Sequence, residues 1–448
     1  MKEPVRIREN ISVPIEEILG RLPSAEDLTQ FRREVRIKGE RIRHDTRFRN
    51  NPLSIGESGP RATFRASGIS GALNLFGTNI QVSPKFVVSP DHLRSWQQSV
   101  ITMLDSTRKK VFTYSRVRDL ALRRATFIDH VALAYSDAIQ SALREEAIHV
   151  YERREERAPF LRGRFAVERQ MRSILDRPHR IECDVDYRET NNHFNHLLHW
   201  AADRFSSLVL DSQVRRQVDR VKQELPAVSG PPRVPMHLPL RAPAQYRHFD
   251  EPLDIASILA RGYAHGDQRG AFAGYGFVLN MEKLFEDFVE ASLRRSQSDL
   301  SLELRPQDVR LYAKSIGKVR SYYTRPDNAL YKSGLPALLV DAKYKTLGEG
   351  DVELVLKKPN NADVYQLFAS MVAHGCTRGL LVYPQILSDE DLGDGKVRWW
   401  GVSTEAFKAL IGAVALPISD LRSKSALGNV DGHLRAIVNA ALGQALPV

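Results

Sequence analysis

Two acidic residues and one lysine in the last third of the chain have a spacing that suits the cleavage of phosphodiester bonds. Thirteen residues separate Asp327 from the triplet Asp-Ala-Lys at 341–343, which directly follows an apolar run. Because side chains alternate along a strand, we expect Asp341 and Lys343 to lie on one face. A hairpin between the two acids would bring their carboxylates together. Burying such charges is costly unless they bind a metal or pair with each other.

Mg²⁺ is the ion that this combination favours, because hard carboxylate oxygens bind it while it keeps several waters. Such an ion acidifies a bound water and neutralises the charge that develops as the P–O bond breaks. Lys343 would orient that water or stabilise the developing negative charge. The alternative is an Asp–Lys pair at a strand end, which is the more common role of an isolated Asp-x-Lys triplet. The dipeptide Pro326-Asp327 and a preceding helix that carries Glu286 favour the metal site.

The elements that position these residues follow a regular pattern. From about residue 264 onward, helical and extended patterns alternate. A helix is predicted over residues 280–295, with Asn280 as its N-cap and apolar residues on one side. A second helix is predicted over residues 362–374 and ends at Gly375. Short strands are predicted over residues 309–312, 318–325, 337–340, 379–383 and 397–402.

Several segments resemble the McrC family, which supplies the nuclease subunit of McrBC-type 5-methylcytosine-specific restriction systems. The strongest are MEKLFEDF at 281–288, DAKYK at 341–345 and DVYQL at 363–367. Weaker similarities lie at residues 80–85, 161–164 and 195–198, so that the resemblance spans roughly residues 65–385. The order of a helix with Glu, then Pro-Asp, then Asp-x-Lys and then a helix with Gln is similar to the core of the PD-(D/E)xK nuclease superfamily.

The resemblance implies an α/β restriction-endonuclease-like C-terminal domain of the PD-(D/E)xK type with a defined catalytic set. Asp327 and Asp341 would be the metal ligands, and Lys343 would be the catalytic lysine. Glu286 would be the acid on the helix that helps to position the metal or the water.

Gln366 and Lys345 are assigned to DNA binding by the same resemblance. Gln366 would contact DNA or brace the site from the second helix, and the alternative is a glutamine on the helix surface. Many nucleases of this kind have a tyrosine four residues after the glutamine, where this chain has Ser370.

The composition fits a basic, soluble protein of several domains. The chain has 448 residues, and its 65 Lys and Arg against 54 Asp and Glu give a formal net charge of +11 at pH 7. Such a surplus favours polyanionic partners such as nucleic acid. The two cysteines lie far apart, which argues against a disulfide scaffold or a zinc site and fits the cytoplasm. No signal peptide, membrane span or nucleotide-binding G-x-x-x-x-G-K-[ST] motif is expected.

Three regions are predicted along the chain. Residues 1–125 would form a β-rich N-terminal module that docks on a partner, and within it residues 31–50 are interpreted as an edge hairpin or a solvated arm. Residues 126–263 would form a helical middle region, which contains a proline-rich linker at 226–243. Residues 264–448 would form the nuclease domain.

The expected function combines the residue chemistry with the resemblance. The chain would hydrolyse phosphodiesters of double-stranded DNA with Mg²⁺ in a modification-dependent, anti-phage restriction system. Its partner would be a McrB-like AAA+ GTPase that selects the target and moves along DNA. Because cutting a duplex needs two active sites, two copies or two complexes are expected to meet on DNA. The alternatives are a repair or recombination nuclease without a motor partner, and a non-cutting activator of an AAA+ ring.

Overall fold

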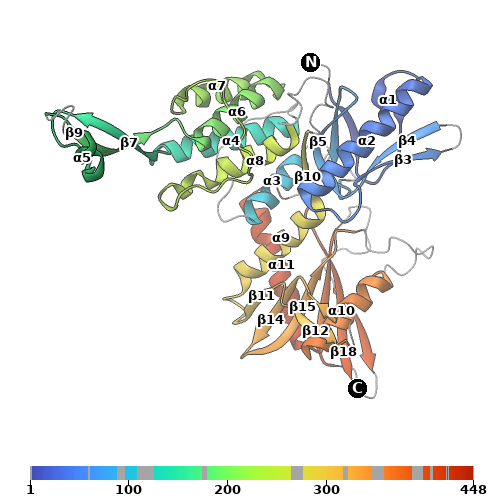
Figure 1. The fold of residues 1–448 in the computed structure, drawn as a ribbon. Coiled ribbons are helices and arrows are strands. Elements are labelled where there is room, and N and C mark those ends of the chain that lie inside the picture. The colour runs from blue at the N-terminus through green and yellow to red at the C-terminus, as the bar shows by residue number, and fades with distance from the viewer. Residues whose placement is uncertain are drawn as a thin grey trace. The chain divides into compact units, whose positions relative to one another are not determined.

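A computed structural model gives the fold of the chain (Figure 1). It describes residues 3–58, 61–87, 96–107, 126–173, 179–263, 276–315, 321–345, 358–385, 397–403, 407–419, 421 and 423–446. The chain divides into two units: the first joins residues 1–130 to residues 265–448, and the second comprises residues 131–264. The boundaries predicted after residues 125 and 263 lie close to these limits, and the division into three domains remains a prediction. Among the described residues, no helix is both long and apolar enough to cross a membrane.

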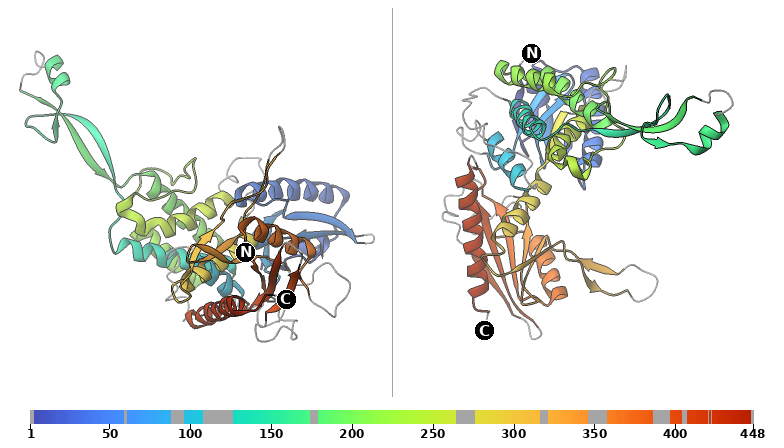
Figure 2. Two further views of the ribbon diagram at one scale, coloured as in Figure 1. Left: turned by 90° about the horizontal axis from the view of Figure 1, so that it is seen from below. Right: turned by 90° about the vertical axis from the view of Figure 1, so that its left-hand side faces the viewer.

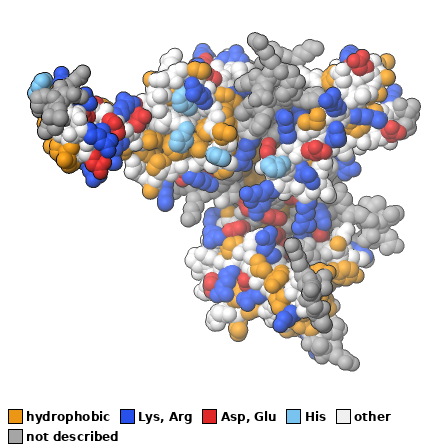
Figure 3. Space-filling view, in the orientation of Figure 1, with side chains coloured by type: hydrophobic (Ala, Val, Ile, Leu, Met, Phe, Trp, Pro, Cys, Tyr) orange, Lys and Arg blue, Asp and Glu red, His pale blue; other side chains and the backbone are white. Residues whose placement is uncertain are grey.

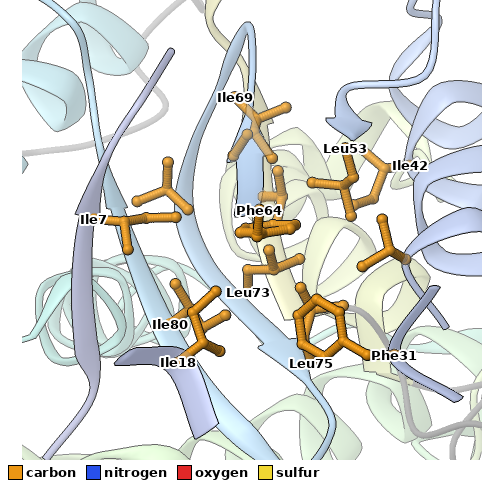
Figure 4. Packing of buried hydrophobic residues seen from close by; sticks show 14 of the residues in the cluster. Ile7, Ile18, Phe31, Ile42, Leu53, Phe64, Ile69, Leu73, Leu75 and Ile80 are labelled. Atoms are coloured by element: carbon orange, nitrogen blue, oxygen red, sulfur yellow. The ribbon is translucent and has the colours of Figure 1, made fainter. Parts of the chain in front are cut away.

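Two small sheets and two helices form the N-terminal part of the first unit. The four-stranded sheet has the order β1 (Val5–Arg8), β6 (Thr78–Ser83), β5 (Ile69–Leu75) and β10 (Gly276–Asn280). The three-stranded sheet has the order β2 (Val13–Pro14), β4 (Arg61–Ala66) and β3 (Leu53–Ser58). The helices are α1 (Ile15–Leu19) and α2 (Ala25–Thr46). Their apolar side chains share one core around Phe31, Phe64 and Leu73 (Figure 4).

Helix α2 shows that the prediction of an edge hairpin or a solvated arm over residues 31–50 was wrong. Ser24 begins the helix in a capping box with Asp27. The buried residues of the helix are Phe31, Glu34, Val35, Lys38, Gly39 and Ile42. Two of these are charged, and Nζ of Lys38 lies 2.5 Å from Oε1 of Glu34. Because this ion pair interrupts the apolar stripe, the helical period is hard to recognise in the sequence.

A six-stranded mixed sheet forms the C-terminal part of the first unit. Its order is β11 (Glu303–Pro306), β14 (Asn328–Lys332), β15 (Leu335–Ala342), β16 (Arg378–Pro384), β18 (Lys408–Leu416) and β17 (Arg398–Ser403). Strands β15, β16 and β18 run parallel, and the outer strands are antiparallel to their neighbours. The strands predicted over 337–340, 379–383 and 397–402 correspond to β15, β16 and β17.

Three helices accompany this sheet, which Figure 2 shows from two further sides. Helix α10 (Asn361–His374) covers one face, where Leu367 and Met371 pack on Leu339. Helix α11 (Lys424–Gly443) packs on β15, β16 and β18 and on α9 (Met281–Ser296). Asn280 caps α9 and Gly375 ends α10, as the sequence predicts.

A separate antiparallel ribbon is formed by β12 (Arg310–Ala313) and β13 (Tyr322–Thr324). These strands correspond to the predictions for residues 309–312 and 318–325. Residues 318–320 of the second prediction lie outside the described residues. Below, "the ribbon" means these two strands together with their described flanks, residues 309–315 and 321–326.

The first unit is built from two stretches of chain that meet near Phe127. Trp96, the first residue of α3 (Trp96–Thr107), stacks on Phe127 with a distance of 5.4 Å between the ring centroids. The ring of Phe127 also lies 5.8 Å from that of Phe277 on β10. Residues on both sides of the second unit in the sequence therefore pack on each other within the first unit.

The second unit combines helices with a long hairpin. The helices are α4 (Phe127–Leu143), α5 (Val167–Ser173), α6 (His193–Leu208), α7 (Ser212–Glu224), the 3-10 helix η2 (Ala244–Phe249) and α8 (Asp250–Tyr263). The hairpin strands belong to a sheet of order β7 (Val150–Ala158), β9 (Ile181–Glu189) and β8 (Arg164–Phe165). The predicted helical middle region is therefore incomplete. Residues 226–243 contain neither helix nor strand.

The hairpin of β7 and β9 was missed because its strands carry charge on both faces. Within β7 only Ala158 is buried. Cross-strand ion pairs hold the hairpin together, with distances of 3.1 Å between Arg153 and Asp186 and 2.5 Å between Arg157 and Glu182. Such strands lack the alternation of apolar and polar residues that normally indicates a half-buried strand.

Candidate active site

Strands β14 and β15 bring Asp327 and Asp341 to the same end of the six-stranded sheet. The antiparallel register pairs Asn328 with Val340, and its extension by one residue sets Asp327 opposite Asp341. The backbone N–H of Ala342 donates a hydrogen bond of 2.8 Å to Oδ2 of Asp327. The two acidic residues singled out in the sequence thus meet at adjacent strand ends.

Lys343 directly follows β15, and its side chain contacts both Asp341 and Gln366 on helix α10. Its Nζ lies 2.7 Å from Oδ2 of Asp341 and donates a hydrogen bond of 3.1 Å to Oε1 of Gln366. Burial lowers the pKa of Lys343, but the negative charges of Asp341 and Asp327 outweigh it and leave the pKa above its ordinary value. The side chain is therefore a fixed ammonium group beside the carboxylates.

Asp327 is the titratable group that its surroundings perturb most clearly in this cluster. Burial raises its pKa to about 8, and the charges of Asp341 and Glu286 and a hydrogen bond with Asp341 add to this effect. The N–H of Ala342 acts in the opposite direction. Near neutral pH, Asp327 therefore retains a proton next to Asp341, and a divalent cation would have to displace this proton.

Glu286 lies on α9 and acts on Asp327 through its charge. Asn280 fixes the start of this helix by accepting a hydrogen bond of 3.0 Å from the backbone N–H of Lys283. The Nζ of Lys283 lies 3.1 Å from Oε2 of Glu286. Glu286 is thus an acid on a capped helix whose charge acts on Asp327, and its catalytic role stays a prediction.

Two further residues near the site, Asp363 and Tyr383, had no role in the sequence analysis. Asp363 is buried on α10 and accepts hydrogen bonds of 2.8 Å from Nζ of Lys345 and 3.2 Å from the hydroxyl of Tyr383. Its position one turn before Gln366 is a signal that was readable in the sequence. Ser370 uses its hydroxyl to bond the backbone carbonyl of Gln366, at 3.1 Å, so its side chain turns back to its own helix.

Residues from the N-terminal part of the chain hold Tyr344, which directly follows Lys343. The hydroxyl of Tyr344 donates a hydrogen bond of 2.9 Å to Oε2 of Glu9. Nζ of Lys85 donates one of 2.6 Å to the carbonyl oxygen of Tyr344 and lies 4.1 Å from the centroid of its ring. Glu9 also accepts from the backbone N–H of Gly68, at 2.9 Å. This buried network links residues that are 335 positions apart in the sequence, and nothing in the local sequence indicates it.

The donor set suits a divalent cation such as Mg²⁺. Asp327 and Asp341 offer carboxylate oxygens, which Mg²⁺ prefers, and an ion of this kind usually keeps several waters. Oδ2 of Asp341 is buried and has no hydrogen bond of good geometry, although Nζ of Lys343 lies close to it. Within the described ranges, no three His, Cys, Asp or Glu side chains gather into a metal cage. The residues therefore fit an ion held by few protein ligands.

Basic side chains are prominent on the surface around this part of the first unit. In Figure 3, Lys and Arg side chains gather with a few acidic ones over the region between the N-terminal sheet and α10. Lys345 contributes an ammonium group whose side chain is 51 % exposed although Asp363 holds it. The charge distribution therefore suits a polyanion at this face.

The raised pKa of Asp327 predicts a pH effect on stability in metal-free buffer. The folded carboxyl has a pKa of about 8, compared with an ordinary value of 3.8. The stability that its proton provides is complete below the ordinary value and is lost as the pH rises through about 8. We expect Asp327→Asn to remove this loss of stability with rising pH, because the amide has no proton to release. The melting temperature of the natural protein should then fall more than that of the variant between about pH 5 and pH 9, by about 2 °C or more.

Thermal melting of both proteins in EDTA measures this difference. Asp299→Asn, at an exposed position where Asp299 pairs with Arg435, is the matched control and should keep the natural pH profile. Parallel curves for the natural protein and Asp327→Asn would show that Asp327 does not hold the proton.

The fold and the site together define a mixed α/β protein with two paired carboxylates, one buried and one half-buried, and a lysine at adjacent strand ends. The model of the family described as McrBC 5-methylcytosine restriction system component matches residues 64–384, well over half of the chain. The chain therefore belongs to this family, which confirms the family predicted from the sequence. No curated protein matches the chain.

The solved structures that are similar to the chain include two McrBC assemblies. One is a refined half-complex from a tetradecameric assembly of Thermococcus gammatolerans McrB AAA+ hexamers with bound McrC. It has a TM-score of 0.65 and 16% identity, with 97% of this chain and 100% of that chain covered. The other is a cryo-EM structure of the Thermococcus gammatolerans McrBC complex, with a TM-score of 0.46, 16% identity and coverage of 66% and 88%. The first likeness shows that the fold is shared over nearly the whole chain.

Proposed function

We propose that the chain is the DNA-cleaving subunit of a modification-dependent restriction system and that it hydrolyses DNA phosphodiesters with Mg²⁺. Its C-terminal part would be a restriction-endonuclease-like domain of the PD-(D/E)xK type. The observation that carries the proposal is the meeting of Asp327, Asp341 and Lys343 at the ends of two paired strands. A buried and a half-buried carboxylate beside an ammonium group add little net stability to a fold, whereas the same groups are well suited to phosphodiester cleavage.

Each residue of the site has a proposed task. Asp327 and Asp341 would hold Mg²⁺, which when bound acidifies water and neutralises charge on the phosphate. Lys343 would donate to a phosphate oxygen as negative charge develops there, and its hydrogen bond to Gln366 fixes the direction of the ammonium group. Glu286 would help to position the attacking water.

Lys345 would contact the DNA backbone. Its hydrogen bond to Asp363 holds the side chain in place, and half of the side chain remains exposed. An ammonium group in this setting attracts phosphate without reading the base sequence. Cleavage itself would therefore have little sequence preference, and target choice would lie with another subunit.

The proposed partner is a hexameric AAA+ GTPase of the McrB type. The solved structure that shares the fold contains McrB AAA+ hexamers with bound McrC, and we extend this arrangement to the present chain by analogy. The docking surface predicted for residues 1–125 is part of this proposal. Two such complexes meeting on DNA would supply one active site for each strand.

Cleavage of methylated plasmid DNA by the purified chain with the AAA+ GTPase from its own organism tests this function. We expect double-strand cleavage that needs GTP, Mg²⁺ and both proteins, and that stops on addition of EDTA. Cleavage without the GTPase would indicate a repair-type nuclease. Stimulation of the GTPase without any cleavage, across Mg²⁺ and Mn²⁺, would indicate a non-cutting activator and contradict the proposal.

A further inference from the structure

The ribbon presents several aromatic side chains to solvent. Tyr312, Tyr322 and Tyr323 are 52%, 72% and 64% exposed, and Leu311 is 46% exposed. In both views of Figure 2 the ribbon projects away from the six-stranded sheet. Since a short ribbon gains no core from side chains in this position, such a group of exposed rings indicates an interaction surface.

The charge of the ribbon favours a polyanionic partner. Its described residues, 309–315 and 321–326, contain Arg310, Lys314 and Arg325 and no acidic residue. Arg310 contacts the hydroxyl of Tyr331, at 3.1 Å, and pairs with Asp308 just before the ribbon, at 3.5 Å. Lys314 and Arg325 are exposed. Aromatic rings interleaved with basic side chains are the usual composition of surfaces that bind nucleic acid.

The ribbon leads directly into the active site. Arg325 precedes Asp327 by two residues, so the exposed surface and the carboxylate pair lie on one continuous segment. Helix α10, which carries Gln366, packs against both strands of the ribbon. The same helix exposes a further tyrosine, Tyr365, at 69%. A duplex that reached Asp327 would therefore pass beside these rings.

We propose that the ribbon is a DNA-binding element that lies along the duplex next to the phosphate to be cleaved. A two-stranded ribbon fits the major groove of B-form DNA. The tyrosine rings would pack on sugars and bases, while Lys314 and Arg325 contact phosphates. This inference rests on the proposed nuclease function and adds a substrate surface beyond Lys345 and Gln366.

The affinity of the full chain for a duplex of about 30 base pairs, measured by fluorescence anisotropy in EDTA, tests the ribbon apart from cleavage. The double variant Tyr322→Ser/Tyr323→Ser should raise the Kd at least about tenfold, the loss expected for one aromatic contact with a nucleic acid. Its salt dependence should match that of the natural protein, because no charge is removed. Arg325→Gln should instead reduce the slope of log Kd against log salt concentration by about 0.9.

A matched control is Tyr151→Ser, because Tyr151 is 63% exposed on the charged hairpin of the second unit. This variant should bind the duplex with the natural Kd. An unchanged Kd for the double tyrosine variant overturns the inference. The inference is also overturned if the double tyrosine variant binds DNA normally but no longer binds the AAA+ GTPase, because the ribbon would then be a protein-docking surface.

Failure of the proposed function gives a different result. If the natural protein never cleaves DNA but the double tyrosine variant still binds the duplex more weakly, the nuclease function is contradicted and the DNA-binding role of the ribbon is supported. If the natural protein cleaves DNA and the double variant binds normally, only the ribbon inference falls.

Discussion

Asp341→Ala is expected to lower the single-turnover rate of DNA cleavage at least about a thousandfold. The variant removes one of two proposed metal ligands, and a bound cation contributes several kcal/mol of transition-state stabilisation, about 1.4 kcal/mol for each factor of ten. DNA affinity in EDTA should stay close to that of the natural protein or increase, because a buried negative charge is removed near the phosphate. Cleavage of a labelled duplex with the AAA+ GTPase present measures the first quantity, and anisotropy measures the second.

The fold must survive for this test to be informative. Asp341 is buried and pairs with Lys343, so its removal leaves an ammonium group without its closest carboxylate. Asp341→Asn keeps the shape and should lose cleavage to the same extent. Circular dichroism and thermal melting establish that both variants are folded. Natural cleavage rates in a folded Asp341→Asn protein would remove Asp341 from the catalytic set.

The second largest effect is expected from Lys343→Ala, which should lower the maximal single-turnover rate about a hundredfold to a thousandfold. The ammonium group is fixed by Asp341 and Gln366, and its loss would remove the donor proposed for the phosphate. Lys345→Ala, two residues away, should mainly raise the DNA concentration needed for half-maximal cleavage, because the proposed contact of Lys345 is with the DNA backbone. Titration of the single-turnover rate against DNA concentration separates the two effects.

A charge-matched control is available at the other end of the same hairpin. Lys332 is exposed on β14, where it pairs with Leu335 beside the turn. Lys332→Ala removes one positive charge and should change neither the maximal rate nor the half-saturating DNA concentration. The assignment of Lys343 would be contradicted if Lys343→Ala and Lys345→Ala affected only the half-saturating concentration.

The parts of the site that could be predicted from sequence are those that local rules determine. Strand alternation places Asp341 and Lys343 on one face. The short hairpin pairs the two strands antiparallel, so that Asp327 lies beside Asp341. The cap at Asn280 and the stop at Gly375 are equally local. These features depend on neighbours within a few residues, so a single sequence contains enough information to predict them.

The parts that were missed depend on contacts across long sequence distances or on ion pairs. Glu9 contacts Tyr344, which lies 335 positions later in the sequence. The buried pair of Lys38 and Glu34 hides the apolar face of α2. The strand β7 is held by salt bridges rather than by a buried face. In each case the stabilising partner cannot be identified from the segment itself.

The contacts of Phe127 with Trp96 and Phe277 bear on how residues 131–264 can change in length or be replaced during evolution. The insertion of residues 131–264 is flanked by stretches of the first unit that pack on each other, because the rings of Phe127 and Phe277 lie 5.8 Å apart. Insertions at such points are well tolerated. The inserted segment can therefore be lengthened, shortened or exchanged as a cassette during evolution. Such changes would leave the candidate site unaltered, because Glu286, Asp327, Asp341 and Lys343 all lie in the flanking stretches.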